Sequence, residues 1–231
     1  MDKEVLSEKI SDLKQKVLAK LNVMNIFDDV KKGLDILIKN ESISYSYLVL
    51  LFLIYEGKFI ENIVDLEILN IIAEAKGENQ ALAIYYLLNN RSFLNKSNYR
   101  DIIRIIGKAE DFSVPVIYSL LMDLNALNTD YIGEVIHIIA EAKGEEQAIL
   151  ASSLRRCSSH REITMKAIYL ASVLDNLSVQ LLKERNVADL MITLFASKEN
   201  YNIGELQTAS VTEDTPGKYK LVLIPKQKEG D

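Results

Sequence analysis

Runs of apolar residues at helical spacing, separated by short charged corners, fill most of the chain. In segment 62–75, isoleucine, leucine and valine occupy more positions than one helix face can hold, and segment 79–88 is also largely apolar. Between them lies the corner EAKGE, where we expect Gly77 to end the first helix in a left-handed conformation and Glu78 to begin the second helix. We expect the same of Gly144 and Glu145 in the second copy of this corner. The pattern therefore predicts two helices joined by a tight corner.

This helix pair recurs along the chain. IIAEAKGENQA begins at Ile71 and IIAEAKGEEQA at Ile138, so ten of eleven residues agree at a spacing of 67. A related layout begins midway, at Ile105, another begins at Ile36, and a weaker copy lies near Asp175. The period is therefore 33–35 residues. Helix pairs of this kind bury their apolar faces only when neighbouring pairs stack before and after them.

The middle copy replaces the glycine corner with EDFSVP. Here Asp111 and Ser113 are candidate N-caps of the following helix, and Pro115 fits into its first turn.

The period resembles that of tetratricopeptide and pentatricopeptide units, and the layout of the helix pairs resembles short HEAT repeats. The chain has no tryptophan and carries the full signature of none of these families, so the resemblance is to helical-repeat architecture, over residues 36–194. It implies an all-α fold: a right-handed α-solenoid of about five helix-pair units.

The two ends of the chain differ from this array. Segment 1–26 predicts an N-terminal capping helix, with Val5, Ile10, Leu13, Val17 and Leu21 at helical spacing. The array then occupies 27–199, and 200–231 predicts a β-hairpin with Pro216 and Gly217 in its loop, followed by a tail.

The hairpin has two interpretations. It covers the apolar end of the array, or it is the wing of a winged helix in which helices between residues 163 and 197 form a helix-turn-helix. In the second case four lysines would reach phosphates: Lys218, Lys220, Lys226 and Lys228.

Composition narrows the choice of partner and compartment. A net charge of −6 argues against a surface that coats nucleic acid or an anionic membrane, so a protein partner is favoured. The single cysteine, Cys157, excludes an intrachain disulfide, and the first residues resemble no signal peptide, so we expect a cytoplasmic protein. The most apolar run, 47–55, is too short to cross a membrane and predicts a buried helix.

No pattern of residues predicts catalysis. The two histidines are His137 and His160, and there is no zinc spacing, Gly-rich phosphate loop or G-x-S-x-G turn. Cys157 and His160 could share a helix face as a thiol and a base, but one pair at this spacing is a weak signal. His137 is interpreted as a polar residue at an interface between repeats. We expect no catalytic residue, cofactor or metal.

Basic residues form two clusters. Arg100, Arg104 and Lys108 lie at i, i+4 and i+8 on one face of a predicted helix, just after Arg91 and Lys96. The second cluster consists of Arg155, Arg156, Arg161 and Lys166. One or two periods separate the clusters, so they could share one side of the array and follow an acidic groove or a phosphate backbone. The simpler interpretation is a solvated helix face.

Two functions follow as hypotheses. The first is a non-enzymatic helical-repeat scaffold or adaptor that binds a protein partner, with Tyr85, Tyr86 and Tyr118 as candidate groove contacts on second helices. The alternative is a subunit of a nucleoprotein assembly, of plasmid-partition, chromatin or CRISPR type. Such a subunit would contact DNA or RNA through the basic residues or the hairpin.

Overall fold

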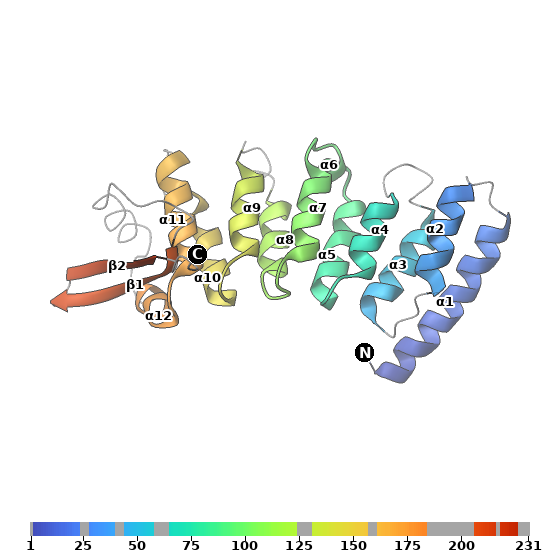
Figure 1. Ribbon diagram of the computed structural model, residues 1–231, viewed down its shortest axis with the longest axis horizontal. Helices are drawn as coiled ribbons and strands as arrows, with labels where there is room; N and C mark the ends of the chain where they lie inside the picture. Colours follow the sequence, from blue (N-terminus) through green and yellow to red (C-terminus); the bar gives the residue numbers. More distant parts are fainter. Residues whose placement is uncertain are drawn as a thin grey trace, which may run out of the picture. The chain divides into compact units, whose positions relative to one another are not determined.

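The computed structural model describes residues 2–23, 28–39, 44–57, 65–123, 131–156, 161–183, 206–215 and 218–225 (Figure 1). In these segments the chain forms twelve α-helices and ends in a two-stranded antiparallel sheet. The prediction of a mostly helical chain with a C-terminal hairpin is therefore confirmed. The residues fall into two compact units, 1–115 and 116–231, which are described separately.

The first unit contains two sets of helices. Its elements are α1 (Lys3–Val23), α2 (Asp28–Lys39), α3 (Tyr45–Glu56), α4 (Leu66–Ala73), α5 (Glu78–Leu88), α6 (Arg91–Leu94), α7 (Tyr99–Lys108) and the first turn of α8 (Val114–Met122). Helix α4 packs against both α2 and α7, whereas α5 packs against α3 and α7, and α1 covers α3. The first helices of successive pairs thus contact one another, as the second helices α3 and α5 do.

The second unit repeats part of this arrangement and adds the hairpin. Its further elements are α9 (Ile132–Ala140), α10 (Glu145–Ser153), the short 3-10 helix η2 (Leu154–Arg156), α11 (Arg161–Val173), α12 (Asn176–Lys183), β1 (Leu206–Thr215) and β2 (Lys218–Pro225). Helix α11 packs against α9 and α10, α10 packs against α12, and β1 packs against α11 and α12. Strand β2 pairs with β1 and ends at Pro225.

The most apolar run of the sequence forms α3, which is buried as predicted. Leu50, Leu51, Leu53 and Ile54 on this helix are almost fully covered. Burying one such side chain contributes about 1.5–3 kcal/mol, so this helix is a principal source of stability for the first unit. No helix in the described part of the chain is both long and apolar enough to cross a bilayer.

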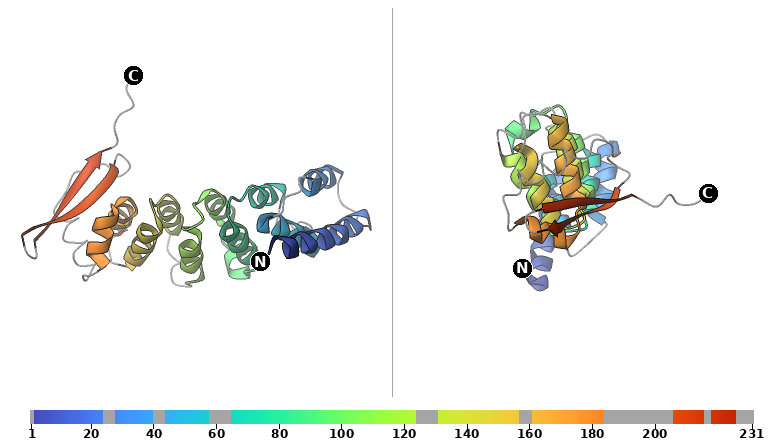
Figure 2. Two further views of the ribbon diagram at one scale, coloured as in Figure 1. Left: turned by 90° about the horizontal axis from the view of Figure 1, so that it is seen from below. Right: turned by 90° about the vertical axis from the view of Figure 1, so that its left-hand side faces the viewer.

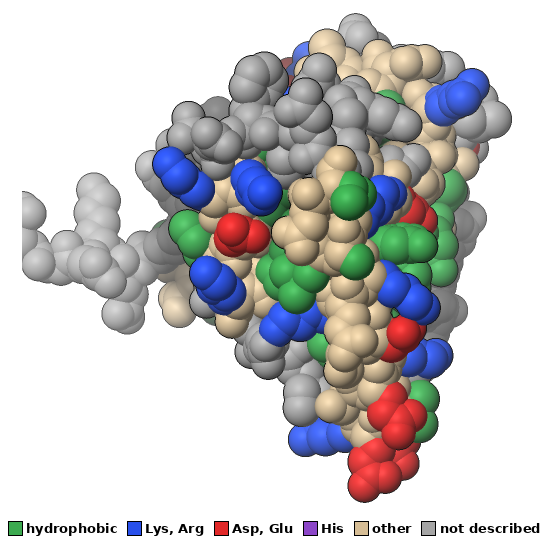
Figure 3. Space-filling model, turned by 90° about the vertical axis from the view of Figure 1, so that its right-hand side faces the viewer, with side chains coloured by type: hydrophobic (Ala, Val, Ile, Leu, Met, Phe, Trp, Pro, Cys, Tyr) green, Lys and Arg blue, Asp and Glu red, His purple; other side chains and the backbone are tan. Residues whose placement is uncertain are grey.

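Helix α1 buries one face against α3. The buried residues are Leu6, Ile10, Leu13, Val17 and Leu21, so Leu6 takes the place that the sequence suggested for Val5. Figure 3 looks onto the end of the first unit that α1 and α2 form, where basic side chains surround groups of hydrophobic ones. The exposed apolar side chains of these helices include Val5, Leu18 and Ile36.

The glycine corners adopt a different conformation from the one expected. Gly77 and Gly144 have φ angles of −127° and −169°, which are extended, and each is the N-cap of the following helix. Gly57 is the glycine with a left-handed φ among the described residues. The left-handed prediction is thus wrong for both Gly77 and Gly144. At Gly77 the conformation is open to any residue, so space decides the choice of glycine. Glycine is needed there because a Cβ atom would lie 2.0 Å from Oδ1 of Asp111.

Asp111 also differs from expectation, because its carboxylate bonds the start of an earlier helix. Its Oδ1 accepts from the Asn79 N–H at 3.1 Å and its Oδ2 from Asn79 Nδ2 at 3.0 Å. Asn79 is the second residue of α5, so Asp111 supplies the cap that Gly77 cannot. Ser113 is buried, and its hydroxyl has no hydrogen-bond partner among the described residues.

One buried polar residue stands near the start of each second helix. We call these residues the corner side chains, and they are Ser46, Gln80, Ser113, Gln147 and Ser178, spaced by 34, 33, 34 and 31 residues. Buried polar groups are costly unless they are hydrogen-bonded, so their recurrence indicates a shared structural task.

Four corner side chains bond the backbone of the element that follows. Ser46 Oγ donates to the Ala75 carbonyl at 3.2 Å and Gln80 Nε2 to the Ala109 carbonyl at 2.5 Å. Gln147 Nε2 donates to the Leu174 carbonyl at 2.9 Å. Ser178 Oγ lies 3.4 Å from the Val211 carbonyl, on β1. Each of these four pairs is thus tied to the next corner or, at the end of the chain, to the hairpin.

Candidate functional site

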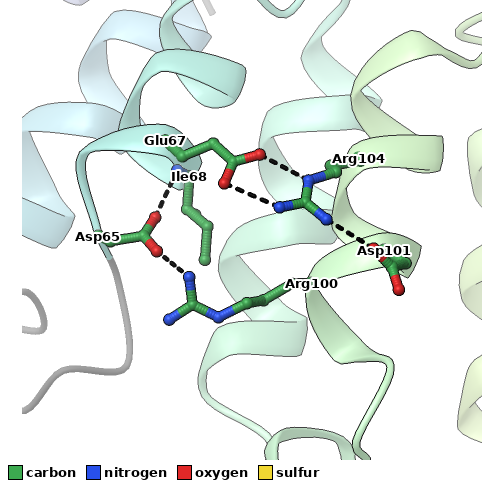
Figure 4. Close-up of polar contacts among 6 residues, drawn as sticks. All are labelled: Asp65, Glu67, Ile68, Arg100, Asp101 and Arg104. Carbon is green, nitrogen blue, oxygen red and sulfur yellow. Dashed lines mark hydrogen bonds and ion pairs between the residues drawn. The ribbon is translucent and has the colours of Figure 1, made fainter.

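Two arginines of the predicted basic cluster are paired with acidic residues of α4 (Figure 4). Arg100, on α7, bonds the carboxylate of Asp65, which is also the N-cap of α4 and accepts from the Ile68 N–H at 3.0 Å. Arg104 bonds Glu67 through Nε at 2.5 Å and through a second nitrogen at 2.9 Å. It also bonds Asp101 at 2.6 Å. These contacts hold α7 against α4.

The ion pair shifts both partners toward their charged forms. The hydrogen bonds that Arg104 donates to Glu67 and then to Asp101 raise its pKa. The hydrogen bond from Arg104 lowers the pKa of Glu67. Both groups are exposed, so solvent screens the interaction, but at neutral pH the arginine charge is matched by neighbouring carboxylates.

A groove of about 430 Å³ lies between α4 and α7 beside this ion pair. Its floor contains Ile71 and Gly107, where a Cβ atom on the glycine would lie 2.3 Å from Ile71 Cγ2. Its rim carries Glu67, Glu74, Lys76, Arg104 and Lys108. Lys76 and Lys108 make no ion pair with any described residue. Of the predicted cluster, only Lys108 therefore contributes an unmatched charge here, together with Lys76.

The second basic cluster is also partly neutralised. Arg155 bonds Asp123 at 2.7 Å, and both side chains are largely covered. Arg161 pairs with Glu134 and lies 5.5 Å from the ring centroid of Tyr131. Lys166 pairs with Glu162 at 2.7 Å. The side chain of Arg156 lies outside the described part of the structure, and the two clusters belong to different units.

Exposed aromatic residues gather on the second helices of the first unit. Phe52 and Tyr55, one turn apart on α3, are 42% and 40% exposed, and Tyr86 on α5 is 53% exposed. Tyr85 meets Tyr86 edge to face, with ring centroids 5.6 Å apart. We call these four residues the aromatic surface. Phe52 precedes Tyr86 by 34 residues, one period of the sequence pattern.

Polar contacts hold the aromatic surface in place. The Tyr85 hydroxyl donates to Glu56 of α3 at 3.0 Å, and burial followed by this bond raises the pKa of Tyr85. Lys20 of α1 bonds the Tyr55 carbonyl, and its ammonium lies 5.0 Å from the Tyr55 ring centroid. Tyr118, the third predicted contact, lies half-buried on α8, 33 residues after Tyr85.

The sequence suggested Tyr85 and Tyr86 as candidate contacts but did not suggest Phe52 and Tyr55. These two stand in the most apolar run of the chain, where every residue is a candidate for the core. The sequence does hold one signal for this position: Phe52 precedes Tyr86 by one period.

The remaining candidate residues are His137, Cys157 and His160. His137 is exposed, with its Nε2 3.5 Å from an oxygen of Glu141, so the expectation of an interface position is wrong. Cys157 and His160 lie outside the described residues. In the segments that the structure describes, no group of three or more histidine, cysteine or acidic residues is placed to hold a metal ion.

Comparisons with known proteins gave no relative. No family model, curated protein or solved structure matches the chain.

Proposed function

We propose that the chain is a non-enzymatic helical-repeat scaffold, an α-solenoid whose second helices bind a segment of a protein partner. The sequence period, the paired helices and the corner side chains that bond the next corner support the repeat architecture. In such folds one face of successive helices forms an extended binding surface.

The aromatic surface carries this proposal. Aromatic residues are enriched at the centres of protein interfaces, because they bury large areas at a small cost in side-chain entropy. Phe52, Tyr55 and Tyr86 are exposed, although most other apolar residues of α3 and α5 are buried. Three large apolar groups on neighbouring helices expose a surface that a partner segment would cover.

A protein partner is favoured over nucleic acid because several of the predicted phosphate contacts already have acidic partners. Arg100, Arg104 and Arg161 pair with carboxylates, and binding a phosphate would require these pairs to be broken. The overall charge of −6 opposes nucleic-acid binding further. A nucleoprotein subunit remains the alternative outcome of the test below.

Site-specific photocrosslinking in cells that produce the chain tests the proposal. A photoreactive phenylalanine analogue replaces Tyr86, and in a control chain it replaces Ile149, an exposed apolar residue of α10. We expect the Tyr86 probe to capture one protein, and Phe52→Ala together with Tyr55→Ala to reduce that capture about tenfold or more. The adducts are identified by mass spectrometry, with and without nuclease treatment.

Three results would contradict the scaffold. Equal capture by the Ile149 probe would show that the aromatic surface has no special role. Adducts that disappear after nuclease treatment would favour the nucleoprotein alternative. A chain that retains oligonucleotides with a steep salt dependence, lost on changing Arg100, Arg104 and Lys108 to glutamate, would favour it as well.

A further inference from the structure

Strand β1 is fixed to the last helix pair by hydrogen bonds from one of its edges. The Asp175 N–H donates to the Ala209 carbonyl at 2.9 Å, and the Val211 N–H donates to Ser178 Oγ at 2.6 Å. Thr208 Oγ1 donates to the Val173 carbonyl at 3.0 Å. Figure 2 shows the hairpin beside α12 in two further views. This edge of β1 is therefore occupied by the helical part of the second unit.

These bonds also determine which backbone groups of β2 face outward. In an antiparallel ladder, residues directly opposite each other either exchange hydrogen bonds or both point their backbone groups away. The backbone groups of Ala209 and Val211 that make these bonds point away from β2. In the ladder, Ala209 lies opposite Leu223 and Val211 lies opposite Leu221. The N–H and C=O groups of Leu221 and Leu223 therefore point away from β1, at the outer edge of β2. The same alternation places those of Tyr219 there.

The outer edge of β2 pairs with no strand among the described residues. Beside it, Lys220, Val222 and Ile224 share the exposed face of the strand, and Val222 is 38% exposed. An edge with free backbone groups and exposed apolar residues is a template for pairing with another strand. We propose that two copies of the chain pair antiparallel through this edge and form a four-stranded sheet, with Leu221 opposite Leu221 of the partner subunit.

The edge is complementary to itself in this register. Tyr219 then lies opposite Leu223 of the partner subunit, and Lys220 lies opposite Val222 of the partner subunit, so no two lysines face each other. Pro225, which lacks an N–H, lies beyond the paired residues, where the missing donor costs no hydrogen bond. A two-fold axis through Leu221 closes the assembly at two copies.

Charge variants at Val222 test the register. In the proposed dimer, Val222→Glu creates two glutamate–lysine pairs across the new interface, whereas Val222→Lys creates two lysine–lysine pairs. Within one chain the residue opposite Val222 on β1 is Ser210, which is neutral. We expect dimerisation of the full chain, measured by analytical ultracentrifugation over a range of concentrations. The dissociation constant should be about tenfold lower for Val222→Glu than for Val222→Lys.

Net charge predicts the opposite order, which makes the result decisive. Because the chain carries −6, an added lysine lowers general repulsion between copies and an added glutamate increases it. Leu177→Glu and Leu177→Lys are the matched controls, since Leu177 is 79% exposed on α12, outside the strands. We expect this pair to follow net charge only.

The proposal is overturned if the unmodified chain is monomeric at all concentrations. It is equally overturned if the two Val222 variants dimerise alike or in the order that net charge predicts. Circular dichroism and thermal unfolding of each variant check that the hairpin is retained, and a variant that loses it is replaced by the corresponding change at Ile224.

Discussion

Two corners built from nearly the same eleven residues, one in each unit, make the same hydrogen bond to different neighbours. In the first, Gln80 Nε2 donates to the Ala109 carbonyl, and its Oε1 accepts from the Gly77 N–H at 3.0 Å. In the second, Gln147 Nε2 donates to the Leu174 carbonyl and also to Asn176 Oδ1, each at 2.9 Å. The shared glutamine therefore performs the shared task of reaching the next corner.

The single residue that differs between the two phrases is one that meets the next corner. Asn79 bonds the Asp111 carboxylate, whereas the corresponding residue of the second phrase is Glu146. The position of Asp111 is taken in the second unit by Asn176, which lines a cavity of about 420 Å³ together with Glu146. A glutamate beside Asp111 would place two carboxylates together, and the exchange of aspartate for asparagine avoids this. The difference thus reflects the neighbour rather than the corner itself.

Replacing the glycines should give the largest difference in stability between the two corners. Gly77→Ala places a Cβ atom 2.0 Å from Asp111 Oδ1, whereas at Gly144 the nearest atom is Gln147 Oε1 at 2.8 Å, the end of a side chain. We expect Gly77→Ala to lower the free energy of unfolding by about 3 kcal/mol and Gly144→Ala by about 1 kcal/mol, measured by urea denaturation. Equal losses would show that Asp111 moves aside freely.

Removing the glutamine should affect both corners by a similar amount. Gln147→Leu leaves the Leu174 carbonyl buried without its donor, and Gln80→Leu does the same to the Ala109 carbonyl. We expect each to cost about 2 kcal/mol in urea denaturation. Gln180→Leu, at an exposed position of α12, is the control and should cost little. A change of less than half the expected size would mean that water replaces the amide.

Exchanging the differing residue should have an intermediate effect that a second change reverses. Asn79→Glu keeps the backbone N–H but loses the hydrogen bonds that Asn79 Nδ2 donates to Asp111, and it adds a like charge, so we expect a loss of about 1 kcal/mol. Adding Asp111→Asn should restore most of it, as measured in a double-mutant cycle of unfolding free energies. Additive effects at Asn79 and Asp111 would refute the coupling.

The smallest effect is expected at Asp175, the N-cap of α12 in the second unit. Burial acts to raise the pKa of Asp175, but hydrogen bonds from Ser210 and Ser178 outweigh it and lower the pKa. A lowered native pKa stabilises the fold above the ordinary aspartate pKa of about 3.9, and this stabilisation is lost as the pH falls through the native value.

Asp175→Asn keeps the capping oxygen and removes the charge. We therefore expect a loss of about 0.5 kcal/mol at neutral pH that vanishes in acid, seen by comparing urea denaturation of both chains across the pH range. Asp2→Asn, near the exposed start of α1, is the control. A loss that persists unchanged in acid would assign the effect to packing instead of charge.

Local patterns in the sequence were sufficient for the helices and the hairpin, because both depend on spacing within a few residues. Helices α4 and α5 meet at the EAKGE corner, and β2 ends at Pro225, as predicted. The contacts of Asp111 could not be predicted, since its partner Asn79 lies 32 residues away and no local rule relates them. The same reason applies to Arg104. The sequence pattern predicted a basic helix face there, but the partner Glu67 lies 37 residues away.

The corner side chains also make the folding of each helix pair depend on residues that are translated later. Gln80 needs the Ala109 carbonyl, 29 residues further along, and Ser178 needs Val211, 33 residues further along. On the ribosome, the most recently made helix pair therefore cannot form these hydrogen bonds until later residues have been translated. In the second unit the partner lies on β1, so a nascent chain that stalls before Leu206 leaves the Ser178 hydroxyl without its bond to Val211.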